Sequence, residues 1–86
     1  MKNGKVIDLK GSEFYYVNNL LHREDGPAVI WFDDIKEWHY NDLLHREDGP
    51  AIEYPSGKKT WYYHGEKIPV SSQEEFIKYI NLIFIK

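Results

Sequence analysis

The chain contains no cysteine, and no stretch of it approaches the roughly 20 apolar residues that span a bilayer. Without cysteine, disulfides and thiolate metal sites are excluded, which fits a reducing compartment. Residues 1–4 lack the apolar run of a secretory signal peptide. We therefore expect a cytoplasmic protein that has no membrane partner.

The chain also lacks a large surplus of either charge. The formal net charge is only −3, and the lysines and arginines are dispersed among carboxylates. This pattern disfavours nucleic-acid binding, and the net charge is small for an acidic mimic of DNA. Aromatic residues are abundant instead: three tryptophans, seven tyrosines and four phenylalanines in a single predicted domain spanning residues 1–86. Such side chains bury large areas in small cores.

An eight-residue block, Leu-His-Arg-Glu-Asp-Gly-Pro-Ala, occurs twice without change, at residues 21–28 and 44–51. The spacing of 23 residues continues on both sides of the blocks and relates three segments, 6–17, 29–40 and 52–63. Each segment has a β-rich run, a turn signal and an aromatic strand. A self-similar period of this kind predicts a repeat architecture.

Each segment is predicted to form a β-hairpin, because residue pairs rich in Gly, Asp and Ser supply turn conformations at the same phase. These hairpin turns are Lys10-Gly11, Asp33-Asp34 and Ser56-Gly57. Between hairpins, further tight turns are predicted at Asn18-Asn19, Asn41-Asp42 and His64-Gly65. The predicted fold class is mainly β: a meander of three stacked antiparallel β-hairpins in a repeat array over residues 6–68, with a C-terminal α-helix.

A different pattern follows the array, in which apolar residues recur at helical spacing and predict an α-helix over residues 73–84. Ser72 and Glu75 match a capping box at its start, and the same box also fits one residue earlier. The β-branched residues of the run 82–85 leave a terminal strand as an alternative. We expect the helix to close one end of the sheet, to lie across one face or to pair with another copy.

One repeating unit extends from Trp38-His39-Tyr40 through His45 and Gly49 to Ser56-Gly57, and the next begins at Trp61. This unit resembles the MORN repeat. The closer likeness is to a MORN-like variant with His-Arg-x-Asp-Gly-Pro-Ala blocks, which is seen in proteins of bacteriophages and large viruses. The resemblance implies a sheet of successive hairpins without catalytic activity, and a scaffold or binding role.

The two blocks combine histidine, arginine and paired carboxylates, so a metal site, an acid–base centre or an anion clamp has to be considered. Adjacent residues of an extended segment point to opposite faces, however, and do not converge without a tight bend. We therefore predict that the histidines bond neighbouring backbone, that the aspartates form Asx-type turns, and that Arg23 and Arg46 pair with carboxylates of the adjacent repeat. The residues with a predicted structural role are His22, Asp25, Gly26, Pro27, His45, Asp48, Gly49 and Pro50.

Neither a metal nor a cofactor is predicted. No two of the four histidines have the i, i+4 spacing of a helical metal site. The chain also shows no Gly-rich phosphate loop and no serine or cysteine nucleophile motif. We therefore predict that the protein is not an enzyme.

Alternation along the aromatic strands separates two sets of candidate binding residues. Trp38 and Trp61 share one face, where burial in a core is the stronger interpretation for large aromatic side chains. Tyr16, His39 and Tyr62 lie one position further along each strand and therefore on the opposite face. There, a role in binding is as well supported as simple exposure.

Three functions from different classes follow. The first is a small binding protein, and the viral resemblance implies a phage-encoded inhibitor that engages a host protein such as a defence component. The second is a nucleotide-sequestering protein, in which Arg23 and Arg46 hold a phosphate beside a stacked base. The third is a homo-oligomeric structural module that associates through its sheet edges or through the helix.

Overall fold

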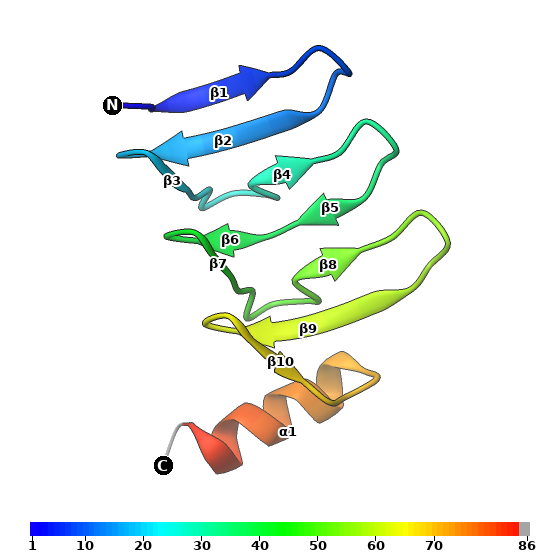
Figure 1. The fold of residues 1–86 in the computed structure, drawn as a ribbon. Helices are drawn as coiled ribbons and strands as arrows, with labels where there is room; N and C mark the ends of the chain where they lie inside the picture. Colours follow the sequence, from blue (N-terminus) through cyan, green and yellow to red (C-terminus); the bar gives the residue numbers. More distant parts are fainter. Residues whose placement is uncertain (85–86) are drawn as a thin grey trace.

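The computed structural model describes residues 1–84 and shows a mainly β chain with one C-terminal helix (Figure 1). Its strands are β1 (Gly4–Ile7), β2 (Glu13–Val17), β3 (Leu20–Leu21), β4 (Val29–Ile30), β5 (Lys36–Glu37), β6 (His39–Tyr40), β7 (Leu43–Leu44), β8 (Ile52–Glu53), β9 (Lys59–Tyr63) and β10 (Glu66–Ile68), and its helix is α1 (Gln73–Ile83). The main sheet has the order β1-β2-β4-β5-β8-β9-β10, with β3 paired to β2, and β6 pairs with β7. The predicted fold class is confirmed.

The three predicted hairpins correspond to β1–β2, β4–β5 and β8–β9, all of them antiparallel. Their turns place Gly11, Asp34 and Gly57 at φ values of 93°, 70° and 93°. Glycine adopts this left-handed region without a steric penalty, and aspartate tolerates it better than most residues. The turn chemistry read from the sequence therefore fixes the tip of each hairpin.

The predicted turns between hairpins also form, and they connect one repeat to the next. Both residues of each turn have positive φ: 51° and 70° at Asn18-Asn19, 48° and 71° at Asn41-Asp42, and 47° and 85° at His64-Gly65. Two consecutive positive φ values are typical of a type I′ turn. The second residue donates its N–H to a carbonyl of the preceding repeat, at 2.9 Å for Asn19 to Lys2, 2.8 Å for Asp42 to Leu21 and 2.8 Å for Gly65 to Leu44.

The strand registers sort the side chains of the sheet onto two faces. Cross-strand pairs link Phe14, Val29, Glu37, Ile52 and Thr60 in one row. Paired residues in a sheet share a face, and neighbours along a strand alternate between faces. This row therefore lies on one side, and the residues next to it in each strand lie on the other.

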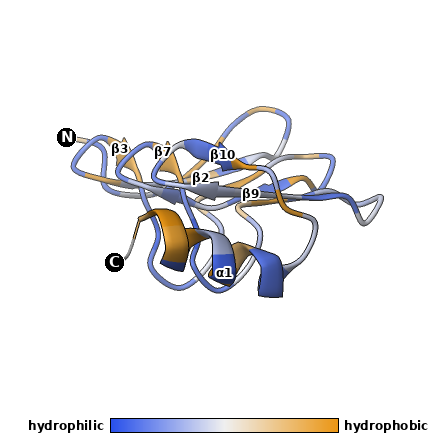
Figure 2. Ribbon diagram, turned by 90° about the horizontal axis from the view of Figure 1, so that it is seen from below, coloured by the Kyte–Doolittle hydropathy of each residue, from blue (hydrophilic) through white to orange (hydrophobic). Residues whose placement is uncertain are grey.

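The second face carries Tyr15, Trp38 and Trp61, and the rest of the chain packs against it. The guanidinium of Arg23 lies 3.9 Å from the ring of Tyr15, and that of Arg46 lies 3.9 Å from the ring of Trp38. Figure 2 shows α1 on one side of the plane of β2 and β9. We call this side the covered face. The other side, which carries the Phe14 row and has no helix, we call the open face, although Val29 and Ile52 of that row are 1% and 8% exposed.

The core lies at the end of the array, where α1 packs against β9 and β10. Trp61, Ile68, Phe76 and Ile80 form one buried cluster, in which Phe76 is 0% exposed and Trp61 4% exposed. The indole Nε1 of Trp61 also donates a hydrogen bond to Oε1 of Gln73 at 2.8 Å. Of the three expected positions of the helix, the structure shows it at one end of the sheet, beyond β10 (Figure 1) and displaced toward the covered face.

The start of α1 follows the predicted capping box. Ser72 is the N-cap, and its hydroxyl accepts the Glu75 N–H at 3.2 Å. The Glu75 carboxylate accepts in return from the Ser71 N–H and hydroxyl. The helix continues to Ile83, so the alternative of a terminal strand is wrong up to residue 84, and residue 85 lies outside the described part. No helix within residues 1–84 has the length and apolarity needed to cross a membrane.

Candidate functional site

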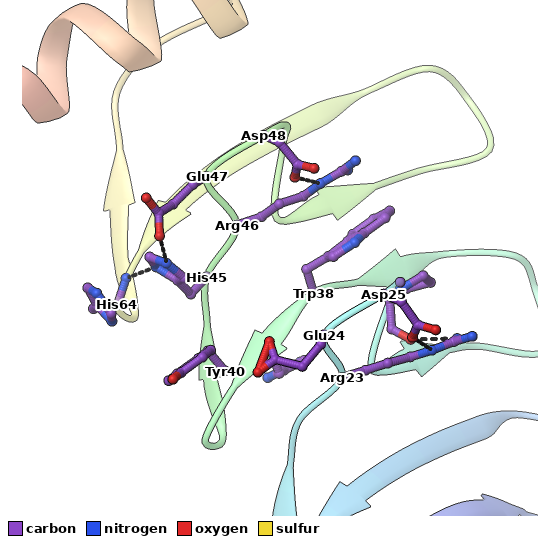
Figure 3. Close-up of a pocket in the computed structure, with 13 residues that line it drawn as sticks. Arg23, Glu24, Asp25, Trp38, Tyr40, His45, Arg46, Glu47, Asp48 and His64 are labelled. Carbon is purple, nitrogen blue, oxygen red and sulfur yellow. Dashed lines mark hydrogen bonds and ion pairs between the residues drawn. The ribbon is translucent and has the colours of Figure 1, made fainter.

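A groove of about 760 Å³ lies between the two repeated blocks on the covered face (Figure 3). Its lining comprises Arg23, Glu24, Asp25, Gly26, Pro27, Trp38, His39, Tyr40, His45, Arg46, Glu47, Asp48 and His64. In Figure 3, Trp38 lies between the Arg23–Asp25 pair and the Arg46–Asp48 pair. Four carboxylates and two guanidinium groups therefore line one recess.

The guanidinium of Arg46 is held on several sides. Its Nε donates to the Asp48 carboxylate at 2.9 Å, and its Nη1 donates to the Pro50 carbonyl at 3.2 Å and to the Glu53 carboxylate at 3.0 Å. Its plane lies over Trp38, an arrangement that favours a cation–π contact. Arg46 therefore acts as a clamp that folds the second block back onto the sheet.

Arg23 repeats this arrangement in the first block. Its Nε donates to Asp25 at 3.1 Å, its Nη1 to the Pro27 carbonyl at 3.2 Å, and its plane lies over Tyr15. The predicted pairing with the adjacent repeat is found only for Arg46, because Ile30 occupies the position that matches Glu53.

The aspartates of the two blocks have a different role from the predicted Asx-type turn. Asp25 and Asp48 accept the Nε–H of the arginine two residues earlier, and their side chains are 86% and 88% exposed. The glycine that follows each aspartate leaves room for the guanidinium. The sequence pattern predicted an Asx-type turn instead of this ion pair, because Asp-Gly-Pro is also a common turn signal.

The histidines bond neighbouring backbone, as predicted, and each one joins two repeats. Nδ1 of His22 accepts the Asn41 N–H at 3.1 Å, and Nδ1 of His45 accepts the His64 N–H at 2.8 Å. We call each of these contacts a histidine rung. Because Nδ1 is the acceptor, the ring proton of a neutral histidine lies on Nε2, which is 3.0 Å from the Glu24 carboxylate in the first block.

His45 occupies the more crowded of the two rungs. The residue is 8% exposed, and its ring is stacked on the ring of His64 with centroids 4.0 Å apart. Burial lowers the pKa of His45, and the nearby charge of His64 lowers it further, against an opposing contribution from Glu47. The structure therefore favours the neutral form of His45.

Asn3 provides a similar contact at the start of the array. Its Oδ1 accepts the Asn18 N–H at 2.9 Å, in the place where the histidines serve the later turns. The contacts between repeats therefore include Asn3, whereas the sequence pattern places the start of the array at residue 6. The repeat spacing could have indicated this contact. Asn18 precedes Asn41 by one period of 23 residues, so the N–H of Asn18 is expected to need an acceptor as the N–H of Asn41 does.

Of the three candidate residues on the open face, Tyr16 and Tyr62 are not among the residues that line the groove, whereas His39 is one of them. Tyr16 and Tyr62 are half-buried, the side chain of His39 is only 9% exposed, and all three share this face with the Phe14 row. Nε2 of His39 is 2.8 Å from one carboxylate oxygen of Glu37. That hydrogen bond is the largest cause of the lowered pKa of Glu37, which is therefore ionised at neutral pH.

Trp31 extends the aromatic character of the open face. Its ring lies edge-on to that of Phe14, with centroids 5.5 Å apart at 87°, and its Nε1 donates to the second carboxylate oxygen of Glu37 at 2.8 Å. Phe14 and Trp31 were not among the residues selected from the sequence. Their role depends on the cross-strand register, which the repeat pattern by itself does not give.

The two tryptophans of the covered face have different surroundings. Trp61 is in the core beneath α1, whereas Trp38 is half-buried beneath Arg46. The difference arises because Pro69 occupies the position that would hold a third arginine, and α1 replaces the missing block.

The two block glycines offer a matched test of the arginine clamp. A Cβ at Gly49 would lie 2.6 Å from Cζ of Arg46, whereas a Cβ at Gly26 would lie 3.1 Å from Cζ of Arg23. We expect Gly49→Ala to displace Arg46 from Trp38 and lower the free energy of unfolding by about 1–3 kcal/mol, the typical effect of overpacking. Gly26→Ala should cost less. Urea unfolding of both variants measures the difference, and equal effects would contradict the clamp geometry.

Comparison of the chain with family models, curated proteins and solved structures gave no match. Within residues 1–84, no group of three or more histidine, cysteine, aspartate or glutamate side chains has the geometry of a metal site. The resemblance to MORN-like repeats therefore remains a prediction from the repeated blocks. The contacts described above are the basis for assigning a function.

Proposed function

We propose that this protein is a non-enzymatic module that binds another protein through its open face. The observation that carries the proposal is the asymmetry of the sheet. The arginine clamps and α1 pack on the covered face, whereas the opposite side of the β2–β9 plane carries β3, β7 and β10 but no helix (Figure 2). Tyrosine and tryptophan are the residue types most enriched at the energetic centres of protein interfaces.

The open face is also well ordered by its own contacts. Glu37 holds Trp31 through one oxygen and His39 through the other, both at 2.8 Å. Side chains that are already fixed lose little conformational entropy when a partner binds. This arrangement supports recognition of a protein surface, where aromatic rings supply contact area and the ionised Glu37 lies half-buried among them.

The biological setting that we propose is inhibition of a host protein in the cytoplasm by a phage-encoded chain. It rests on the resemblance of the repeated blocks to those of viral MORN-like proteins. An inhibitor of this kind is expected to capture one host protein at a fixed stoichiometry. Affinity capture from host lysate followed by mass spectrometry tests this setting.

The surface itself is tested by substitution once a captured partner is in hand. We expect Tyr16→Ala and Tyr62→Ala each to weaken binding at least tenfold, which corresponds to about 1.4 kcal/mol. Tyr40→Ala is the control, because Tyr40 is an exposed tyrosine on the covered face. The unfolding midpoint of each variant separates loss of binding from loss of fold. Binding that depends on Tyr40 and not on Tyr16 or Tyr62 would refute the assignment of the open face.

The nucleotide-sequestering alternative depends on Arg23 and Arg46, and their contacts weigh against it. Each guanidinium already has a carboxylate partner and already covers an aromatic ring that a base would need. The four carboxylates of the groove would also repel a phosphate. We therefore expect calorimetric titration with linear and cyclic nucleotides to give no binding heat. A saturable heat that disappears in Arg46→Gln would reinstate this alternative.

A further inference from the structure

We propose that the edge strand β1 pairs with β1 of a second copy to form a symmetric dimer. β1 ends the sheet on one side, and all of its residues are exposed. An exposed edge strand presents a row of backbone groups that pair readily with another chain. At the opposite end α1 lies beyond β10 (Figure 1), so head-to-tail addition of copies is obstructed, and pairing of like edges gives a closed dimer.

The bonds of β2 show which backbone groups of β1 point outward. Tyr15 donates its N–H to the Ala28 carbonyl at 2.8 Å and accepts the His22 N–H at 3.0 Å, so both of its backbone groups point away from β1. Tyr15 is the cross-strand partner of Lys5. In an antiparallel pair, hydrogen-bonded and non-hydrogen-bonded positions alternate. Lys5 and, two residues later, Ile7 therefore direct their N–H and C=O groups outward from the sheet.

An antiparallel pairing centred on Val6 uses these groups. Val6 then faces the second copy's Val6 in a non-hydrogen-bonded position, and Lys5 exchanges hydrogen bonds with the second copy's Ile7 on both sides of the axis. In this register the two Lys5 side chains do not face each other, so the pairing avoids a like-charge contact across the strands.

The side chains of β1 are compatible with this pairing. Lys5 does not shield the edge as edge lysines often do, because its Nζ lies 3.1 Å from the Glu13 carboxylate of its own sheet. Val6 and Ile7 are 40% and 59% exposed, and both would lose apolar exposure in the dimer. The two-fold axis is perpendicular to the sheet, so both open faces lie on the same side. The dimer does not depend on the proposed function, because it forms from the purified chain alone.

Sedimentation equilibrium of the purified protein tests the proposal with a pair of charge variants. The unmodified protein is expected to show a monomer–dimer equilibrium. Val6→Glu and Val6→Lys each place like charges opposite one another at the axis, and each should raise the dissociation constant at least tenfold. An equimolar mixture of the two variants should restore dimerisation, because the charges then complement each other. Val17→Glu and Val17→Lys are the controls: Val17 is 43% exposed, close to Val6, but lies on β2.

A second measurement does not rely on substitution. Amide hydrogen exchange at Lys5 and Ile7 should slow as the protein concentration rises, because these outward N–H groups become protected only in the dimer. Exchange at Asn18, whose N–H already bonds Asn3, should not change. A protein that sediments as a monomer at all accessible concentrations, with concentration-independent exchange at Lys5 and Ile7, would overturn the proposal. Val6 variants that dimerise individually as well as the unmodified chain would overturn it as well.

Discussion

Phe76→Ala is expected to lower the free energy of unfolding by about 3–5 kcal/mol, the usual cost of truncating a buried phenylalanine. Phe76 is 0% exposed and packs with Trp61, Ile68 and Ile80 in a buried cluster that holds α1 on the sheet. Globular domains have only about 5–15 kcal/mol of stability in total. The variant should therefore lose a large part of its stability, and α1 should separate from the sheet.

Urea unfolding measured by far-ultraviolet circular dichroism and by tryptophan fluorescence checks this result. Ile77→Ala is the matched control, because Ile77 is the next residue of α1 and is 39% exposed. Its effect should be well under half that of Phe76→Ala. Similar losses in the two variants would show that the stability of α1 comes from helix formation and not from packing on Trp61.

The second large effect is expected at the histidine rung of His45. His45→Ala removes the acceptor of the His64 N–H and opens a space beneath the stacked ring of His64. A typical intramolecular hydrogen bond contributes about 0.5–1.5 kcal/mol to stability, and the lost packing of the buried His45 side chain adds to this cost. We expect His45→Asn to recover part of the loss, since Asn3 fulfils the same role through its Oδ1 at the start of the array.

The same rung predicts how stability depends on pH. The pKa of His45 is lowered on folding from its ordinary value of 6.5, chiefly by burial. The unfolded chain therefore binds a proton more readily than the folded chain, so the stabilisation is complete above pH 6.5 and is lost as the pH falls below it. Protonation of Nδ1 would also place two N–H groups against each other at the rung to His64.

Urea unfolding midpoints between about pH 7.5 and pH 5 measure this dependence in the range where histidines titrate. His45→Asn should have a flatter profile over this range. The lowered pKa values of Glu13, Glu37 and Glu75 act in a separate window, because their stabilisation is present above pH 4.5 and is lost below it. Stability that stays constant until the carboxylates titrate would contradict the role of His45.

The elements of this protein were largely predictable because their signals are local. The turns between hairpins are formed by residue pairs that tolerate positive φ, namely Asn-Asn, Asn-Asp and His-Gly. In this chain each of the three pairs forms the predicted turn. Ser72 with Glu75 specifies the start of α1 in the same way. The exact repetition of eight residues then fixed the period, because identical blocks at a constant spacing form identical connections.

The candidate surfaces were predictable only in part. Strand alternation separated Tyr16, His39 and Tyr62 from Trp38 and Trp61, but alternation does not say which face is covered. The placement of Phe14 and Trp31 on the open face follows from the pairing of β2 with β4, and this register between strands could not be predicted from alternation within one strand. The contact of Asn3 with Asn18 was not predicted, because Asn3 is an asparagine in the role that histidines have in the later repeats and lies outside the identical blocks.

The sequence by itself determined the 23-residue period, the hairpins and their turns, and the position of the helix, since each of these depends on residues close together in the chain. Only the tertiary structure decided that α1 covers the face of Trp61 and that the repeated arginines are clamped over Tyr15 and Trp38. The physical reason is that these contacts join residues of different hairpins. The distance in space between such residues depends on how successive hairpins stack, which the local sequence does not determine. Burial of Phe76 against Trp61 then fixed which face is covered and which remains open.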